Sequence, residues 1–258
     1  MARLEGMHVL ITGGGTGIGA AIAAALHAEG ARLSIAGRRH APLAETAMRL
    51  TGTHVIEADV TREADCAAMV EAARAAHGAV DILIANAGAA ESAPLARTDL
   101  AQWQRMIDVN LTGAFLTVRS ALPDLVRAPS SGGGVRRIVL VASTAGLKGY
   151  PYVAAYCAAK HGVVGLARAL AAELAPRGIT ANAVCPGFTE TPLLAGSIAD
   201  IVAKTGRSAD DTRRLLSAGN PQGRFVEPDE VAAAVVWLCL PASASVTGQA
   251  ISISGGEV

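Results

Sequence analysis

Three tyrosines lie close together in this sequence, at positions 150, 152 and 156, and only Tyr156 has a lysine four residues later. If this stretch is helical, Tyr156 and Lys160 project from the same face, because residues four apart are neighbours on a helix. A phenol with a pKa of about 10 exchanges protons poorly at neutral pH, and a neighbouring ammonium group lowers that pKa. The pair therefore indicates an acid or base for proton transfer. Taken alone, the same spacing is typical of a plain helix surface.

Polar residues also follow two of the apolar runs of the sequence. Ser143 comes directly after the run Arg137–Ala142, and Asn86 comes directly after Asp81–Ala85. Asn110 lies in the helical stretch that follows Asn86. Because the carboxyl ends of parallel strands meet at one edge of a sheet, we expect these side chains at or close to that edge.

A glycine-rich turn stands near the beginning of the chain. Leu10–Gly19 reads LITGGGTGIG and joins an apolar run to a helical stretch. Glycines allow a sharp turn and a close approach of the backbone to a pyrophosphate, and the first amides of the helix attract its charge. This strand, turn and helix together predict a dinucleotide-binding site.

The second apolar run carries information about the ribose end of that dinucleotide. An acidic residue usually bonds the 2′-hydroxyl of NAD there, whereas an arginine accommodates the 2′-phosphate of NADP. The segment Leu33–Pro42 contains no Asp or Glu, and Arg38 and Arg39 follow Gly37. The sequence therefore favours NADP(H) over NAD(H). The alternative is that both arginines are solvated side chains at the start of a helix.

Short apolar runs alternate with longer alanine-rich stretches along the whole chain. This alternation predicts a parallel sheet with helices on both faces. We therefore expect residues 1–258 to form a single-domain, Rossmann-type, doubly wound α/β fold with a seven-stranded parallel sheet. The expected strands are His8–Thr12, Arg32–Ala36, His54–Ala58, Asp81–Ala85, Arg137–Ala142, Thr180–Val184 and Ala250–Ser254. The expected helices are Gly17–Glu29, Pro42–Leu50, Arg62–His77, Gln102–Arg127, Val153–Ala175 and Asp229–Leu240, and Ser130–Gly134 is expected to be a flexible loop.

One long connection, Gly187–Gly223, interrupts the alternation. Connections of this length are uncommon in compact domains unless they have a function. We interpret residues 188–222 as a mobile substrate lid with helices at Ile198–Lys204 and Asp210–Ser217, although a structural or oligomer-contact insertion is the alternative. Three arginines of this segment could bind a phosphate of the substrate, or they are solvated charges on the surface of a helix. They are Arg207, Arg213 and Arg214.

Composition narrows the possible functions. The 22 basic and 22 acidic residues give a formal net charge of zero, which argues against nucleic acid or an anionic membrane as the main partner. The four cysteines and six histidines show no metal-ligand spacing, so no metal is expected. No secretion signal and no membrane span are apparent, so we expect a cytoplasmic protein.

Taken together, these motifs resemble the short-chain dehydrogenase/reductase family over essentially the whole chain. The motifs that carry the resemblance are Thr12–Gly19, Asp59-Val60, Asn86-Ala87-Gly88, Asn110, Ser143, Tyr156 with Lys160, and Pro186-Gly187 leading to Thr191-Pro192. The resemblance implies that Tyr156 protonates a carbonyl oxygen, that Ser143 hydrogen-bonds it, and that Lys160 holds the nicotinamide ribose and lowers the Tyr156 pKa. Asn110 would position a water behind Lys160. The implied cofactor contacts are Gly13, Gly15, Thr16, Gly17, Ile18, Gly19, Arg38, Arg39, Asp59, Val60, Asn86, Ala87, Gly88, Tyr156, Lys160, Val184, Pro186, Gly187, Thr189 and Thr191.

Within the family, three segments look most like 3-oxoacyl thioester and polyketide ketoreductases. They are Lys160–Gly165, Asn182–Pro192 and Gly223–Val231. The expected activity is NADP(H)-dependent reduction of a ketone to a secondary alcohol, with Tyr156 as the general acid. The alternatives are a 3-hydroxyacyl-CoA, secondary-alcohol or sugar dehydrogenase that works in the oxidative direction, with NAD as an alternative cofactor, and a non-enzymatic dinucleotide sensor. The resemblance also implies a homotetramer.

Overall fold

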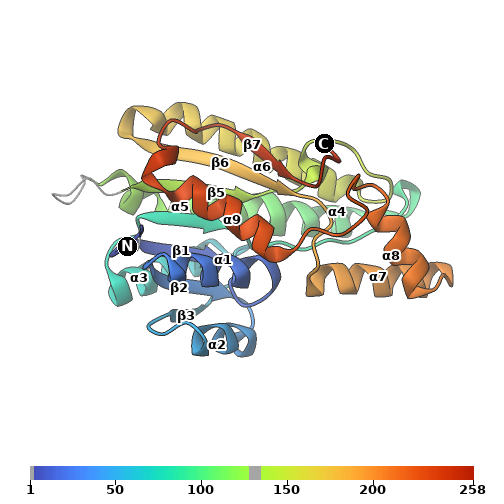
Figure 1. Ribbon diagram of the computed structural model, residues 1–258, viewed down its shortest axis with the longest axis horizontal. Helices are drawn as coiled ribbons and strands as arrows, with labels where there is room; N and C mark the ends of the chain where they lie inside the picture. Colours follow the sequence, from blue (N-terminus) through green and yellow to red (C-terminus); the bar gives the residue numbers. More distant parts are fainter. Residues whose placement is uncertain (1–2, 128–134) are drawn as a thin grey trace.

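The computed structural model describes residues 3–127 and 135–258. Within them, seven parallel strands form one sheet in the order β3-β2-β1-β4-β5-β6-β7 (Figure 1). The strands are β1 (His8–Thr12), β2 (Arg32–Gly37), β3 (His54–Glu57), β4 (Ile82–Ala85), β5 (Arg136–Val141), β6 (Ile179–Pro186) and β7 (Ala250–Ile253). This confirms the predicted Rossmann-type fold, and the loop Ser130–Gly134 lies outside the described residues. The strand order reverses between β1 and β4, which is where open α/β sheets bind ligands.

Helices cover both faces of the sheet. One face carries α1 (Gly17–Ala28), α2 (His40–Met48) and α9 (Pro228–Cys239), and the other carries α3 (Glu63–His77), α5 (Gly113–Val126) and α6 (Ala154–Leu174) (Figure 1). Side chains along β1 alternate between these layers. Val9 and Ile11 pack in the cluster of α1 and α9, whereas Leu10 packs in the cluster of α5 and α6. Burial on both faces explains why the strands read as continuous apolar runs.

The predicted helix Gln102–Arg127 is not one continuous α-helix. It consists of α4 (Leu100–Ile107), a π-helical turn (Asp108–Thr112) and α5. The side-chain amide of Asn110 donates to the carbonyl oxygen of Met106 at 3.0 Å. An α-helix would offer that same carbonyl to the backbone amide of Asn110, so the side chain competes with the backbone and favours the wider turn.

The predicted lid segment forms two helices beyond the carboxyl ends of the strands, at the right of Figure 1. The first, α7 (Pro192–Thr205), begins earlier than the predicted Ile198, and the second is α8 (Ala209–Ser217). Each start has a side-chain cap. The hydroxyl of Thr191 accepts from the amide of Leu194 at 3.3 Å, and that of Ser208 accepts from the amide of Asp211 at 3.0 Å. Such caps satisfy amides that a helix leaves unpaired at its start.

Three further features concern the described part of the chain. No group of three or more His, Cys, Asp or Glu side chains there is arranged to hold a metal ion. No helix there is both long enough and apolar enough to cross a membrane. All four cysteines are buried free thiols.

His8 is fully buried at the beginning of β1. Its Nδ1 lies 2.7 Å from the carbonyl oxygen of Gly78, and its Nε2 lies 2.9 Å from the hydroxyl of Ser34. Burial lowers the pKa of His8 to about 4, because the protonated ring would carry a charge into the core. The folded protein therefore excludes a proton that the unfolded chain accepts below a pH of about 6.5.

We predict that the free energy of unfolding falls as the pH is lowered from about 6.5 towards about 4, because only the unfolded chain takes up this proton. The part due to His8 is at most about 3 kcal/mol. His8→Gln removes the titrating group, so urea unfolding across this pH range should show a smaller loss than in the wild type. His40→Gln, which changes an exposed histidine, should keep the full loss. Equal losses in His8→Gln and the wild type would contradict the prediction.

Candidate active site

The glycine turn after β1 packs against the end of β4. Gly13 has a φ of +69°, and a Cβ there would lie 2.7 Å from the Nδ2 of Asn86. A Cβ on Gly19 would lie 2.1 Å from the carbonyl oxygen of Gly13. Only glycine fits at both positions, because any side chain would push the turn away from its neighbours.

The turn leads into α1, and no side chain caps the first backbone amides of this helix. Thr16 is the N-cap residue, and its side chain makes no capping hydrogen bond. The free amides and the positive end of the helix dipole suit an anionic phosphate. These features fit the pyrophosphate of a dinucleotide.

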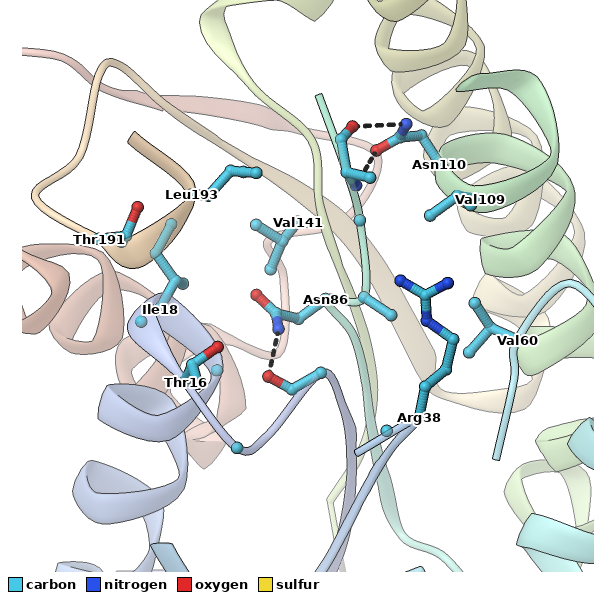
Figure 2. A pocket seen from close by; sticks show the side chains of 18 of the residues that line it. Thr16, Ile18, Arg38, Val60, Asn86, Val109, Asn110, Val141, Thr191 and Leu193 are labelled. Carbon is cyan, nitrogen blue, oxygen red and sulfur yellow. Dashed lines mark hydrogen bonds between the residues drawn. The ribbon is translucent and has the colours of Figure 1, made fainter. Parts of the chain in front are cut away.

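Asn86 ties this turn to the end of β4 (Figure 2). Its Nδ2 donates to the carbonyl oxygen of Gly13 at 3.2 Å, as Figure 2 shows, and to that of Thr12 at 2.9 Å. In return, the hydroxyl of Thr12 accepts from the backbone amides of Asn86 at 3.1 Å and of Ala87 at 3.2 Å. In this arrangement, the Asn86 side chain holds the turn in place.

A cleft opens between the turn, the strand ends and the start of α7. Most of the residues predicted to bind the cofactor line it. They are Gly13, Gly15, Thr16, Gly17, Ile18, Gly19, Arg38, Arg39, Asp59, Val60, Asn86, Ala87, Gly88, Tyr156, Lys160 and Thr191. Asn110 lines it as well, whereas Ser143, Pro186, Gly187 and Thr189 are not among its lining residues. Val184 is fully buried in the core.

The cleft also has lining residues that sequence reasoning missed. They include Ala58, Ala89, Val109, Val141 and Leu193. These apolar side chains carry no chemical signal of their own. Their one common sequence feature is position, since Ala58 follows β3, Val141 ends β5 and Leu193 lies in the first turn of α7.

Arg38 comes from the end of β2 and turns into the cleft beside Val60, away from Thr16 and Ile18 (Figure 2). Asp59 lines the same region of the cleft. Burial opposes the ionised form of Asp59, but hydrogen bonds from Thr61 and the charge of Arg38 outweigh it, so its pKa lies below the usual value. The end of β2 therefore brings a guanidinium group into the cleft. NAD-binding folds usually carry a carboxylate at this position.

The ammonium group of Lys160 lies 5.6 Å from the centre of the Tyr156 ring and donates to the carbonyl oxygen of Val141 at 2.8 Å. Burial lowers the pKa of Lys160 to about 8. Burial also raises the pKa of Tyr156 to about 12, although the nearby hydroxyl of Ser143 opposes this rise. Burial dominates the shift of the Tyr156 pKa in this structure, and a lowering of that pKa by Lys160 stays a prediction. Tyr156 keeps its proton at neutral pH, as a general acid must.

Asn110 and Ser143 are held by backbone contacts. The side chain of Asn110 donates to the carbonyl oxygen of Ala89 at 2.9 Å and accepts from its amide at 3.3 Å (Figure 2). This fixes the loop after β4 beside Lys160, since a Cβ on Gly88 would lie 2.8 Å from the Oδ1 of Asn110 and 3.6 Å from the Nζ of Lys160. The hydroxyl of Ser143 accepts from the amide of Ala145 at 3.1 Å.

Two of the lid arginines have carboxylate partners. Arg213 pairs with Glu190 at 2.5 Å, and Arg214 pairs with Asp211 at 2.5 Å. Both guanidinium groups are partly exposed. These pairs favour the interpretation of both arginines as solvated helix charges over a role in binding a substrate phosphate.

The chain matches a family model described as enoyl-(acyl carrier protein) reductase over residues 13–257. It is 36% identical over 260 residues to the D-beta-hydroxybutyrate dehydrogenase of Cupriavidus necator, with 99% of each chain covered. A solved structure of a single-residue variant of actinorhodin polyketide ketoreductase with NADPH is similar, with a TM-score of 0.92, 36% identity and coverage of 100% of this chain and 99% of that chain.

A second solved structure, the 3-ketoacyl-(acyl-carrier-protein) reductase from Brucella melitensis complexed with NADH, has a TM-score of 0.88 and 34% identity and covers 98% of this chain and 99% of that chain. The protein belongs to the short-chain dehydrogenase/reductase family. It is an oxidoreductase of the class that interconverts secondary alcohols and ketones with a nicotinamide cofactor.

The tight glycine turn leads to a prediction about cofactor binding. Gly19→Ala places a Cβ 2.1 Å from the Gly13 carbonyl oxygen, and relieving such overlap costs about 1–3 kcal/mol, or roughly five- to hundredfold in NADPH affinity. Gly196→Ala is the matched control, because no atom lies within 4 Å of its added Cβ. Fluorescence titration with NADPH should separate the two variants, with a thermal melt of each to verify folding. An unchanged affinity in folded Gly19→Ala would contradict this account of the turn.

Proposed function

We propose that this protein uses NADP(H) to reduce a ketone, of the 3-oxoacyl thioester class, to a secondary alcohol. The main support is the arrangement of Tyr156, which burial keeps protonated, beside the hydroxyl of Ser143 and the ammonium group of Lys160. Tyr156 and Lys160 line a cleft that also contains the free amides of α1 and a guanidinium group at the end of β2.

In the proposed mechanism, the nicotinamide, when bound, supplies the hydride. Tyr156 donates its phenolic proton to the carbonyl oxygen of the substrate, and Ser143 donates a hydrogen bond to the same oxygen as negative charge develops on it. Lys160, through its ammonium group, holds the ribose and offsets the charge left on Tyr156. Asn110 keeps the loop after β4 beside Lys160 through its two bonds to Ala89.

Two observations support NADP(H) as the cofactor. The end of β2 provides Arg38 and Arg39 to the cleft, and a charge-assisted hydrogen bond to a phosphate contributes about 1.5–3 kcal/mol. The carboxylate of Asp59 is hydrogen-bonded to Thr61, with the amide at 3.0 Å and the hydroxyl at 2.8 Å. The Asp59 carboxylate therefore already accepts two hydrogen bonds from its own loop.

The substrate class rests on similarity to ketoreductases together with the sequence segments that resemble them. One observation favours a second candidate: the similarity to D-beta-hydroxybutyrate dehydrogenase covers 99% of both chains. That candidate is the oxidation of a 3-hydroxy acid or another secondary alcohol, with NAD as the acceptor. In that direction Tyr156 would act as the base.

We also propose that residues 188–222 act as a lid over the substrate. In support, α7 contributes Leu193 to the cleft and is tied to the loop after β4 by Lys204, which donates to the carbonyl oxygen of Ser92 at 3.0 Å.

We propose a homotetramer as the assembled form. Exposed apolar side chains on α4 and α5 support it, because a single chain leaves Trp103 and Phe115 partly in water.

The proposed acid is tested by Tyr156→Phe. We expect this variant to oxidise NADPH with a short 3-oxoacyl thioester at least about 100-fold more slowly than the wild type, because it lacks the transferable proton. NADPH affinity, measured by fluorescence titration, should change little. Parallel loss of turnover and NADPH affinity would refute the assigned role of Tyr156.

The same assay on the wild type tests the substrate class. A wild-type protein that binds NADPH but reduces no 3-oxoacyl thioester would overturn that class.

Replacing Arg38 and Arg39 together by serine tests the cofactor preference. The double variant should lose roughly ten- to hundredfold in NADPH affinity, while its NADH affinity stays close to the wild-type value, because only NADPH carries the 2′-phosphate. Arg62→Ser, also exposed and not a lining residue of the cleft, is the matched control for lost positive charge. An equal loss with both cofactors would show that the arginines do not read the phosphate.

A further inference from the structure

A buried carboxylate lies beside the loop that follows Ser143. Glu257 comes after β7 and a turn made by Gly255 and Gly256, and its side chain is only 4% exposed. Its Oε1 accepts a hydrogen bond from the hydroxyl of Tyr150 at 2.6 Å and lies 3.1 Å from the ammonium group of Lys148. Burying a carboxylate is costly unless donors satisfy it, so Lys148 and Tyr150 form a matched socket for it.

The same carboxylate lies close to the backbone at both ends of the lid. A Cβ on Gly187, just before the lid, would lie 3.4 Å from the Oε2 of Glu257. A Cβ on Gly219, near the end of the lid, would lie 3.0 Å from the Oε1. One side chain thus packs against three segments that are far apart in the sequence.

Two neighbours of Glu257, Tyr150 and Gly187, are each close to Ser143 through an adjacent residue. The hydroxyl of Tyr150 lies 2.7 Å from that of Thr144, the residue after Ser143. On the other side, the hydroxyl of Ser143 lies 3.5 Å from the carbonyl oxygen of Pro186, the residue before Gly187. The ring of Tyr150 also meets the first lid residue, Phe188, edge to face at 6.1 Å. Glu257 is therefore connected to Ser143 along two routes, one through Tyr150 and Thr144 and the other through Gly187 and Pro186.

Close packing fixes the turn that carries Glu257. Gly255 has a φ of +63°, and a Cβ there would lie 2.1 Å from the Oδ1 of Asn220 in the lid segment. Asn220 is itself held, because its Nδ2 donates to the carbonyl oxygen of Arg224 at 2.8 Å. The chain after β7 is therefore fitted to the end of the lid, and Glu257 reaches its socket from a fixed position.

We propose that Glu257 is a positioning residue that fastens both ends of the lid to the loop after Ser143, through the carboxylate socket formed by Lys148 and Tyr150. It thereby shapes the substrate side of the site and leaves the dinucleotide cleft unchanged. The effect on substrate binding rests on the proposed ketone reduction. The fastening of the lid can be tested without any substrate.

Glu257→Ala empties the socket and removes the carboxylate that accepts from Tyr150 and pairs with Lys148. Free acetate matches the carboxymethyl group that this substitution removes, so it should bind in the emptied socket, whereas acetamide lacks the charge that Lys148 pairs with. Glu71→Ala on α3 is the matched control, because its carboxylate forms an exposed ion pair with Arg74.

The first experiment measures trypsin cleavage within the lid, which offers exposed basic residues at Lys204, Arg207 and Arg214. Loss of a charge-assisted contact should speed cleavage there by about tenfold or more in Glu257→Ala. Acetate should slow it again, acetamide should not, and Lys148→Met combined with Glu257→Ala should abolish the acetate effect. Cleavage at the wild-type rate, or faster cleavage that acetate leaves unchanged, would overturn the proposal.

The second experiment measures steady-state kinetics with a short 3-oxoacyl thioester. Glu257→Ala should raise the KM for the thioester by about tenfold, with kcat and NADPH affinity close to the wild-type values, and acetate should restore KM. A parallel change in kcat, KM and NADPH affinity without acetate rescue would show a general structural defect and overturn the proposal. If the wild type does not reduce the thioester, the proposed function fails, and the cleavage experiment still decides the role of Glu257.

Discussion

The packing of the first glycine turn on Asn86 is the contact on which the rest of the site depends. It brings the backbone after β1 so close to the end of β4 that a Cβ on Gly13 would lie 2.7 Å from the Asn86 amide. The sheet reverses its strand order between these two strands. Their close approach therefore sets the floor of the cleft, directs the first amides of α1 into it and aligns the loop that carries Gly88 towards Lys160.

Burial decides the chemistry at the other end of the cleft. Two groups that are neighbours on α6 respond to the same surroundings in opposite directions, because burial disfavours whichever form is charged. It raises the pKa of Tyr156 to about 12 and lowers that of Lys160 to about 8. The raised pKa keeps Tyr156 protonated at neutral pH. The π-helical turn at Asn110 belongs to the same arrangement, since it holds the loop after β4 beside Lys160.

The substrate side is built differently from the cofactor side. Glycines, backbone and the Asn86 side chain shape the cofactor side, whereas a buried carboxylate, Glu257, organises the proposed substrate side. Glu257 and Tyr150 are 107 positions apart and share a hydrogen bond. The paired arginines of the lid belong to this side as well, and their carboxylate partners leave little net charge to attract an anionic substrate.

The sequence by itself determined the strands, the parallel sheet and the place of the glycine turn, because these follow from local apolar patterns and from residues that are adjacent in the chain. It also indicated Tyr156, Lys160, Arg38 and Arg39 by residue type and spacing. Only the tertiary structure decided the direction of the Tyr156 pKa shift, because burial depends on segments that pack from elsewhere. It likewise decided the π-helical turn at Asn110, which bonds to Ala89, and the socket of Glu257. Contacts between distant residues leave no periodic or spacing signal in a single sequence.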